Sequence, residues 1–594
     1  MTDLQPIAMD HASLLRESKR LDPAATRSKV RIALLSDAAT QQFVPLLRTL
    51  FHRHGVHADL YEGPFDGIQL EALNPNSGLY RFQPDFIVML NSIQALRAAF
   101  SQRNGDASAF IEERTRGIVE VWDTIQQHTT ATLVQSTFAM PYERYFGNFD
   151  QKVPSSFYSV AAALNACIGQ QVRSRAGVLI NDVESIASWV GRREWFDDRF
   201  WDIAKSFCAL PHMPLVAKNI VDIVMASRGR VVKCVVLDLD NTLWGGVIGD
   251  DGVDGIRLSA HGDGEAFYRL QAYLKELRNR GILLAVCSKN EMAAAVLPFD
   301  KHPDMLLQRS DITVFIANWI DKAENIRKIH DVLNIGFDSM VFLDDNPFER
   351  NLVRCLLPDV IVPELPEDPA DYVRAISELN LFETTSFSGE DLKRAELYRV
   401  EADRREAQAA YASAEDFLQS LDMRIVVSRF DPFHLPRIAQ LIQRSNQFNL
   451  TTHRYTEAEC DALMNNPNVL PLYAKLSDRL GDHGLIGLIV MEPRGDELVI
   501  VDWLMSCRVL ARGVEQYLMN LVVAEARQRN LTNVRGQYIR TAKNQMVEGF
   551  FSQFGFVQTG GDANRADWLL DCSTYQARET FISPAGELAA TVHP

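Results

Sequence analysis

The stretch Val235-Val236-Leu237-Asp238-Leu239-Asp240-Asn241-Thr242 carries an apolar run straight into a turn with two carboxylates. A short run of Val and Leu that ends in a polar turn predicts a buried parallel strand. Open α/β sheets bind their ligands at the carboxyl ends of such strands. Two carboxylates spaced i, i+2 at that edge suit phosphoryl transfer. Asp238 is the expected nucleophile and Mg²⁺ ligand, and Asp240 is expected to protonate the leaving oxygen and later to activate water.

Three later segments supply the other groups that this chemistry needs. Residues 283–290 predict a second apolar strand, which ends at Ser288, whose hydroxyl can hold a phosphate oxygen. Lys322 offers a fixed positive charge against the phosphoryl group. Residues 340–346 predict a third strand that ends in two adjacent acids. Each segment alone is compatible with a helix cap or a surface turn, but their order within one domain's length favours a site. The expected Mg²⁺ ligands are Asp238, Asp240, Asp344 and Asp345.

The four motifs in this order resemble those of the haloacid dehalogenase superfamily. The longer string Asp238–Gly249 is similar to the FkbH-like branch of that superfamily, as are Cys287–Asn290, Asn318-Trp319, Asp344–Pro347 and Glu349-Arg350. The resemblance covers residues 230–560. It implies transfer of a three-carbon glyceryl unit from D-1,3-bisphosphoglycerate, a phosphorylated glycolytic intermediate, to the phosphopantetheine thiol of an acyl carrier protein. Phosphate is removed on the way, and the product supplies a polyketide synthase.

Acyl transfer of this kind needs a thiol on the enzyme, and the sequence leaves two candidates open. Cys287 directly precedes Ser288, so strand alternation turns its side chain away from the pocket if Ser288 faces inward. A small core residue is therefore as consistent with the pattern as a nucleophile. Cys507 is the alternative thiol, because it lies in a turn before a helix, where a thiolate is favoured. The expected substrate-binding residues are Thr242, Asn290, Asn318, Arg508 and Gly513.

Composition limits the classes of partner and compartment. The chain has 594 residues, 47% hydrophobic and 23% charged, which predicts a globular protein of several domains. Its net charge of −16 argues against nucleic acid and anionic membranes as partners. The 8 Cys residues have no metal-binding spacing and are expected to be reduced thiols. Without an apolar stretch that spans a bilayer or an N-terminal signal pattern, we expect a cytoplasmic protein.

Residues 1–29 predict a short helix and linker, and residues 30–220 a first α/β domain. Strands and helices alternate in it, which predicts a parallel sheet. The expected strands are 30–35, 86–90 and 131–134, and the expected helices include 42–54 and 110–127.

The turn Leu35–Ala38 resembles the nucleophile turn of SGNH hydrolases, but Ala38 stands where the serine would be. Asp182–Ser185 replaces the motif that would carry the base, and His212 is interpreted as a packed or surface histidine. Without a nucleophile and a base there is no acyl-enzyme chemistry. We therefore predict a degenerate hydrolase fold with a docking or structural role.

The middle domain, residues 230–366, leaves no room for a substantial cap between its motifs. One amphipathic helix, 263–280, fills most of the first gap. An open mouth suits a carrier protein that delivers a long phosphopantetheine arm, although a plain phosphatase can also lack a cap. Residues 363–366 mark a boundary, and a helical linker, 367–422, follows.

Residues 423–575 predict a third α/β domain before a C-terminal tail, 576–594. Strands 485–490 and 498–502 precede the turn 506–513 and a helix at 514–529, which resembles the pyrophosphate-binding turn of GNAT acyltransferases. Ala511 replaces the first glycine of that turn, whereas Asn544 and residues 550–556 fit the GNAT pattern. A GNAT-like domain that receives phosphopantetheine agrees better with its neighbour than CoA-dependent acetylation does.

Two other functions compete with glyceryl transfer. The first is a Mg²⁺-dependent phosphatase that acts on a small phosphate ester, and a related acyl unit such as D-lactyl is a variant of the transfer itself. The second is a scaffold that only binds metal and carrier protein. Asp240, Ser288 and Lys322 have no use in a scaffold, so an enzyme is the stronger prediction.

Overall fold

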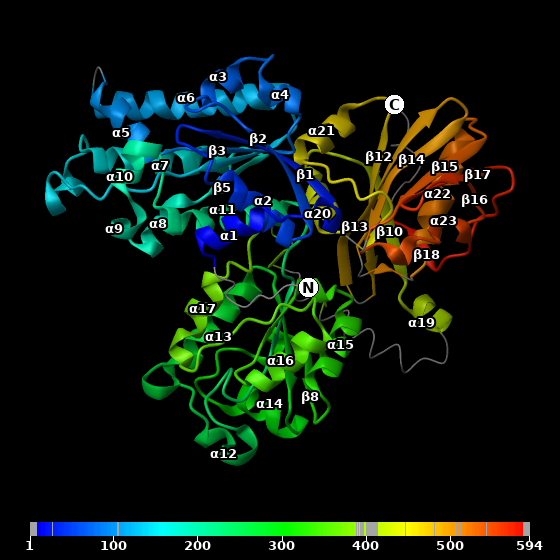
Figure 1. The fold of residues 1–594 in the computed structure, drawn as a ribbon. Helices are drawn as coiled ribbons and strands as arrows, with labels where there is room; N and C mark the ends of the chain where they lie inside the picture. The colour runs from blue at the N-terminus through cyan, green and yellow to red at the C-terminus, as the bar shows by residue number, and fades with distance from the viewer. Residues whose placement is uncertain are drawn as a thin grey trace. The chain divides into compact units, whose positions relative to one another are not determined.

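The computed structural model describes residues 9–26, 28–103, 106–387, 389, 391–392, 397–398, 414–445, 447–479, 481–506, 509–510, 512–541 and 543–585. The described residues form two compact units, one up to Ala226 and one from Ser227 onward (Figure 1). None of the helices in these ranges combines the length and apolarity needed to cross a lipid bilayer.

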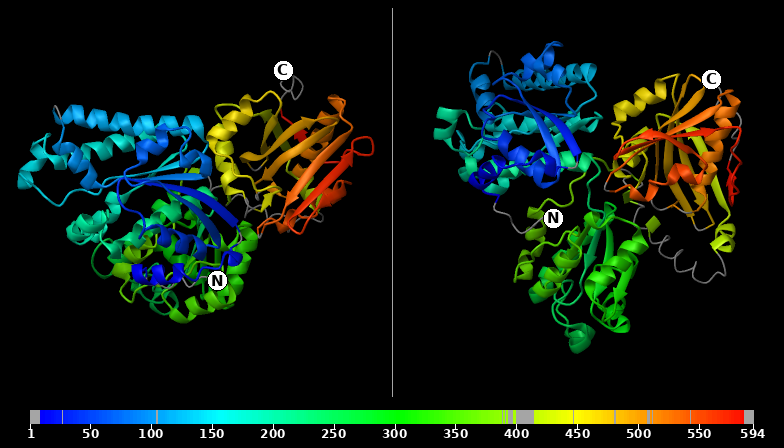
Figure 2. Two further views of the ribbon diagram at one scale, coloured as in Figure 1. Left: turned by 45° about the horizontal axis from the view of Figure 1, so that its top comes forward. Right: turned by 45° about the vertical axis from the view of Figure 1, so that its right-hand side comes forward.

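The first unit is built on a sheet of five strands in the order β2-β1-β3-β4-β5, all parallel. Helices cover both faces, which explains why β1 and β3 are apolar along most of their length. The long helix α6 lies along one face (Figures 1 and 2). The strands are β1 (Ser28–Ser36), β2 (Val56–Glu62), β3 (Phe86–Leu90), β4 (Thr132–Ser136) and β5 (Val178–Asn181).

The parallel sheet of the first unit was predicted, but β2 and β5 were not among the expected strands. Helix α1 lies in the segment expected as an extension, and its Leu14 is buried against α2. The helices are α1 (His11–Ser18), α2 (Val44–Arg53), α3 (Ile68–Leu73), α4 (Gly78–Phe82), α5 (Ile93–Ser101), α6 (Ala107–His128), α7 (Phe157–Arg173), α8 (Val183–Val190), α9 (Arg192–Trp195), α10 (Asp198–Ala204) and α11 (Met213–Ser227).

The second unit begins with a four-stranded parallel sheet in the order β8-β7-β6-β9. Leu237 pairs with Val286 of β7 on one side and with Leu343 of β9 on the other, so the carboxyl ends of β6, β7 and β9 lie at the same edge of the sheet. Only α12 and α13 stand between β6 and β7, which agrees with the expected lack of a large cap. The strands are β6 (Cys234–Leu237), β7 (Leu283–Ser288), β8 (Ile312–Ala317) and β9 (Met340–Leu343). The helices are α12 (Ile248–Gly255), α13 (Glu265–Asn279), α14 (Met292–Lys301), α15 (Lys322–Leu333), α16 (Pro347–Leu356) and α17 (Tyr372–Glu378).

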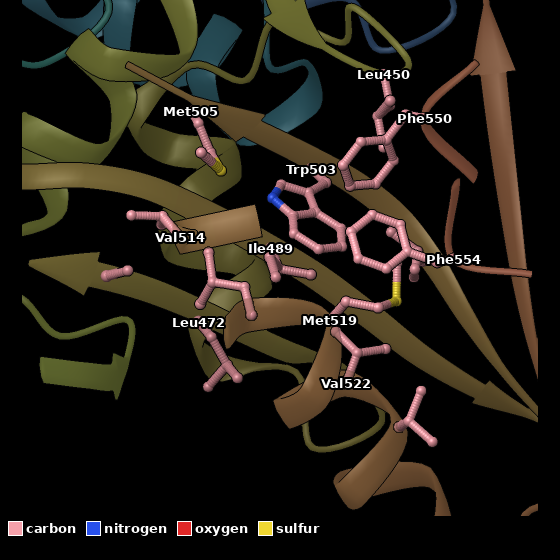
Figure 3. Packing of buried hydrophobic residues seen from close by; sticks show 14 of the residues in the cluster. Leu450, Leu472, Ile489, Trp503, Met505, Val514, Met519, Val522, Phe550 and Phe554 are labelled. Carbon is pink, nitrogen blue, oxygen red and sulfur yellow. The ribbon is translucent and has the colours of Figure 1, made fainter. Parts of the chain in front are cut away.

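A second, mostly antiparallel sheet follows, in the order β16-β17-β15-β14-β13-β12-β10-β18. Helices α20 and α21 pack on one face, and α22 and α23 on the other. Trp503 lies in the hydrophobic core on the face that carries α22 and α23. The ring of Phe550 lies beside it, with 5.0 Å between the two ring centroids (Figure 3).

The elements of this part are β10 (Met423–Arg429), β11 (Phe448–Asn449), β12 (Leu470–Asp478), β13 (Gly481–Arg494), β14 (Glu497–Met505), β15 (Asn533–Ile539), β16 (Val557–Gly561), β17 (Arg565–Asp571), β18 (Ile582–Pro584), α19 (Ala414–Ser420), α20 (Leu435–Arg444), α21 (Glu457–Asn465), α22 (Val514–Gln528) and α23 (Phe550–Gln553).

Candidate active site

Three carboxylates meet at the carboxyl edge of the four-stranded sheet. Asp238 directly follows β6, and Asp344 and Asp345 directly follow β9. One oxygen of each lies within 4.8 Å of the others. Asp238 and Asp344 are buried, and Asp345 is partly buried. The level ends of β6 and β9 therefore bring together acids that are a hundred residues apart in the sequence.

Lys322 is the first residue of α15 and extends into this group of acids. Its Nζ lies 3.0 Å from Oδ1 of Asp238 and donates a hydrogen bond to Asp344. Burial opposes its charge, but Asp238 and Asp344 raise the pKa of Lys322 above its usual value, so the ammonium stays protonated. The structure thus brings the predicted lysine to the predicted acids.

The charges at this edge do not balance, since one ammonium faces three carboxylates. Burial, followed by repulsion from Asp238, raises the pKa of Asp344 to about 6, and the same two causes raise the pKa of Asp345. Oδ1 of Asp238 is buried and accepts no hydrogen bond from the described residues, so Lys322 meets it only as an ion pair. The three carboxylates, when ionised, carry two more negative charges than the one ammonium offsets. Their oxygens are hard ligands, which fits a divalent cation such as Mg²⁺.

Asp240 was predicted as a fourth metal ligand, but its carboxylate is not part of the group. Its Oδ1 accepts hydrogen bonds from the indole of Trp244 and the backbone N–H of Ile248 at 2.9 and 3.0 Å. Its Oδ2 accepts one from Asn290 at 2.8 Å. Three donors fix the orientation of this carboxylate, which suits the predicted acid and base better than a metal ligand.

The other predicted polar residues of this domain mainly hold the site together. Asn290 also donates to Ser288 Oγ at 3.2 Å, so these two residues and Asp240 form one chain of contacts. Thr242 is fully buried, and its hydroxyl accepts from the backbone N–H of Asp345 at 3.2 Å. Asn318 accepts from the side chain of Asn325 at 2.8 Å and so closes the turn that precedes Lys322. Thr242 and Asn318 therefore position acidic and basic groups, and their contact with a substrate stays a prediction.

Cys287 does not have the properties of a nucleophile. Its side chain has no exposed surface and packs in the core on the face that carries α15. The thiol donates to the carbonyl oxygen of Lys322 at 3.6 Å, and burial raises its pKa above the usual value. This burial favours the interpretation of Cys287 as a core residue over its predicted role in catalysis.

The predicted residues in the turn of the third domain can be placed only in part. Cys507 and Arg508 lie outside the described residues. Gly513 has a φ of +87°, which favours glycine, and stands immediately before α22.

Arg350 belongs to one of the motifs found in the sequence, but only the structure shows what its side chain contacts. It is buried on α16 and donates from Nη1 to the carbonyl oxygens of Asp344 and Asp345 at 2.8 and 2.7 Å. Glu364 holds the other side of the guanidinium at 2.8 Å. A buried arginine six residues after the acids fixes the turn that presents them, as outer partners of metal ligands do.

Exposed apolar side chains follow each strand of the four-stranded sheet, at the edge that carries this site. The loops or helix starts that follow β6, β7, β8 and β9 each contribute at least one. The indole N–H of Trp319 donates to Glu291 at 2.8 Å, so two of these segments are in contact. The exposed side chains are Val247, Met292, Trp319, Ile320 and Phe348. We call them the apolar rim.

Comparisons with known proteins show which families and structures this chain is similar to. Residues 31–225 match the family model of the FkbH N-terminal domain. The N-terminal part of a Bacteroides fragilis protein, which contains a phosphatase domain and was solved with Mg, is 37% identical. It covers 64% of this chain and 100% of its own, with a TM-score of 0.61. A HAD-like hydrolase superfamily protein of Schizosaccharomyces pombe is 29% identical over 147 residues, which is 22% of this chain and 85% of that protein.

For the third domain, an Escherichia coli ribosomal-protein-S18-alanine N-acetyltransferase covers 28% of this chain and 97% of its own, at 14% identity and a TM-score of 0.21. That similarity is too low to support a conclusion, and the GNAT-like character of the domain stays a prediction. The other comparisons support an FkbH-like protein with a phosphatase domain of the haloacid dehalogenase type.

Proposed function

We propose that this chain is a Mg²⁺-dependent enzyme that transfers a glyceryl unit from D-1,3-bisphosphoglycerate to the phosphopantetheine thiol of an acyl carrier protein and removes phosphate. The product serves as a starter or extender unit for a polyketide synthase. The observation that carries the proposal is the arrangement of Asp238, Asp344 and Lys322 at one buried edge, with Asp240 held beside them by three donors.

The phosphatase step follows from the placement of these groups. Asp238 attacks the phosphoryl group, and Lys322 offsets the negative charge that builds up there. Asp240, held in one orientation by Trp244 and Asn290, protonates the leaving oxygen and then takes a proton from water. A Mg²⁺ ion bound by the carboxylate group would neutralise further charge on the phosphoryl oxygens.

The acyl-transfer step rests on the open mouth and its partners. The apolar rim lies around a site that has no cap of its own, and such a surface suits a docking protein better than a free metabolite. With Cys287 buried, the acyl group either passes through Cys507, the remaining predicted thiol, or moves from the acyl phosphate to the carrier thiol directly. In the first domain Ala38 stands at the position of the missing serine and is buried, so this position offers no nucleophile and a docking or structural role is proposed for the domain.

A Mg²⁺-dependent phosphatase that acts on a small phosphate ester, or loading of D-lactyl, is the second candidate. The burial of Cys287 favours the phosphatase, since it removes one of the two predicted thiols. The product distinguishes the candidates, because only acyl transfer adds mass to the carrier protein.

The test combines two measurements on the full chain with an acyl carrier protein, the bisphosphate and Mg²⁺. Intact-protein mass spectrometry follows the carrier, and a phosphate assay follows dephosphorylation. We expect a carrier that gains a glyceryl unit, and loss of dephosphorylation in Asp238→Asn but not in the exposed control Asp263→Asn. Phosphate release with an unmodified carrier would select the phosphatase, and a different mass would identify another acyl unit.

A further inference from the structure

A histidine and a carboxylate that the sequence did not connect meet in the third domain. Asp502 lies in β14 and is buried, with 2% of its surface exposed. Its Oδ1 accepts a hydrogen bond from the hydroxyl of Thr451, and its Oδ2 accepts from the hydroxyl of Tyr455. Nδ1 of His453 lies 3.0 Å from the same Oδ2. One buried carboxylate thus holds three side chains of a single segment.

The imidazole of His453 faces outward, although its partner is buried. Half of its side chain is exposed, against 2% for Asp502. The hydrogen bond to Asp502 fixes Nδ1 and leaves Nε2 without a partner among the described residues. A histidine held in this way by a buried carboxylate is oriented as a general base.

The backbone that presents His453 is in an uncommon conformation. Thr452 has a φ of +60°, in the left-handed region that a β-branched residue rarely adopts. The side chain of Asn449 accepts from the backbone N–H of Thr452 at 2.7 Å and holds the turn. Strain of this kind persists where the surroundings enforce it, and it is concentrated at functional sites.

His453 and Asp502 lie where two parallel strands of the sheet separate. The parallel strands β14 and β15 pair only from Glu497 to Val499 on the β14 side. Beyond that point the segment around β11 bonds to both of them: Asn449 pairs with Leu504 of β14, and the carbonyl of Leu450 accepts from Ile539 of β15 at 2.8 Å. The segment that fills this opening continues directly into His453. His453 follows this segment with half of its side chain exposed, so a ligand can reach it.

Another Asp–His–Tyr group in the same domain has an evident structural role. Nδ1 of His434 lies 2.8 Å from Asp431, which also accepts from the hydroxyl of Tyr473. Asp431 accepts from the backbone N–H of His434 as well, where α20 begins, so this group closes the helix start. His453 caps no helix and is more exposed. His434 therefore offers a matched control.

We propose that His453, positioned by Asp502, is the general base that deprotonates the carrier's phosphopantetheine thiol for acyl transfer. This rests on the proposed function. In this direct route no enzyme-bound thioester forms: Nε2 takes the proton of the carrier's S–H group, and the thiolate forms a C–S bond with the acyl carbon of the acyl phosphate. The C–O bond to phosphate breaks, the phosphate leaves with the electron pair, and the imidazolium gives its proton to it. His453 is the catalytic residue, and Asp502 is a positioning residue.

The test compares His453→Gln, Asp502→Asn and the control His434→Gln in the full chain with carrier protein, bisphosphate and Mg²⁺. We expect His453→Gln to slow thioester formation by about 10²- to 10⁴-fold, with dephosphorylation of a small phosphate ester unchanged. The control should load the carrier at the unaltered rate. Asp502→Asn should also shift the pH profile of loading to lower pH, since the hydrogen bond to Asp502, aided by the charge of Glu459, raises the pKa of His453.

Two outcomes contradict the proposal, and they are distinguishable. Loading by His453→Gln at the full rate would overturn the role of His453 and leave the proposed function intact. A carrier that gains no mass even with the unaltered protein would overturn both.

Discussion

Lys322 Nζ lies 3.0 Å from Oδ1 of Asp238, the buried carboxylate oxygen that accepts no hydrogen bond from the described residues. The acid follows β6 and the lysine begins α15, so the fold itself sets this separation. The oxygen of the proposed nucleophile therefore has an ion-pair partner but no hydrogen bond from the described residues. Such an oxygen can take a cation or attack a phosphoryl group without first breaking a hydrogen bond.

Lys322→Met separates charge compensation from metal binding. The substitution keeps an apolar chain of similar length and removes the ammonium. We expect dephosphorylation to fall by at least about 10²-fold, because the phosphoryl charge loses its partner. Mg²⁺ binding, measured by titration calorimetry, should persist, because the three carboxylates remain. Loss of both would mean that Lys322 mainly holds the acids in place.

Asp240→Asn should mainly lower turnover, whereas Asp345→Asn should mainly weaken Mg²⁺ binding. The carboxylate of Asp240 lies outside the group that could hold a metal, so its replacement should lower turnover by about 10²- to 10⁴-fold without weakening Mg²⁺ binding. Asp345 is inside the group, so its replacement should weaken Mg²⁺ binding first. Calorimetry and a phosphate assay on both variants decide this. Equal loss of Mg²⁺ affinity in the two would contradict the assignment.

The sequence predicted the parts of this site that depend on local pattern. Strands β6, β7 and β9 are short apolar runs with polar ends, and their parallel pairing brings the acids together. The amphipathic β2 was missed because polar residues interrupt its apolar ones, whereas β8 is a short apolar run that was not identified as a strand. Tertiary partners could not be predicted. Asp240 faces Trp244 and Asn290 rather than the other acids, and no local signal marks that choice.

The contact between His453 and Asp502 in the third domain could not be predicted from the sequence either. His453 and Asp502 are separated by 49 positions and meet only because the segment around β11 inserts beside β14. For Cys287, in contrast, the local sequence pattern was informative. Strand alternation indicated that its side chain points away from the pocket if Ser288 faces inward, and the structure places the thiol in the core.

Cys287→Ala should leave acyl loading intact. The thiol is buried, and its pKa is raised by burial, so it supplies no thiolate. The cost should be confined to stability, at roughly 1 kcal/mol for one small buried group. Intact-protein mass spectrometry of the carrier checks the first point, and thermal unfolding checks the second. If Cys287→Ala abolished loading while Cys507→Ala did not, the relay would run through Cys287 after all.

Arg350→Met should weaken Mg²⁺ binding although Arg350 touches no ligand oxygen of the side chains. Its guanidinium holds the carbonyl oxygens of Asp344 and Asp345, and partners of this kind typically change metal affinity by about 10- to 100-fold. Arg354 on the same helix also pairs with Glu364 but donates to the carbonyl of Val362 instead. Arg354→Met is therefore the matched control and should bind Mg²⁺ normally in calorimetry.

The first unit should gain stability on mild acidification through Asp37, which follows β1 where that strand and β3 end side by side. Burial raises the pKa of Asp37 to about 6, even though its carboxylate accepts from the backbone N–H of Ser92 at 2.7 Å. The folded state therefore binds a proton that the unfolded state does not bind between about pH 4 and pH 6. Stability from this group rises as the pH falls through that window, because the buried charge disappears. Asp37→Asn removes the titration, so the difference in Tm between the two proteins should shrink from pH 7 to pH 5. A difference that does not vary with pH would show that Asp37 titrates at its ordinary value.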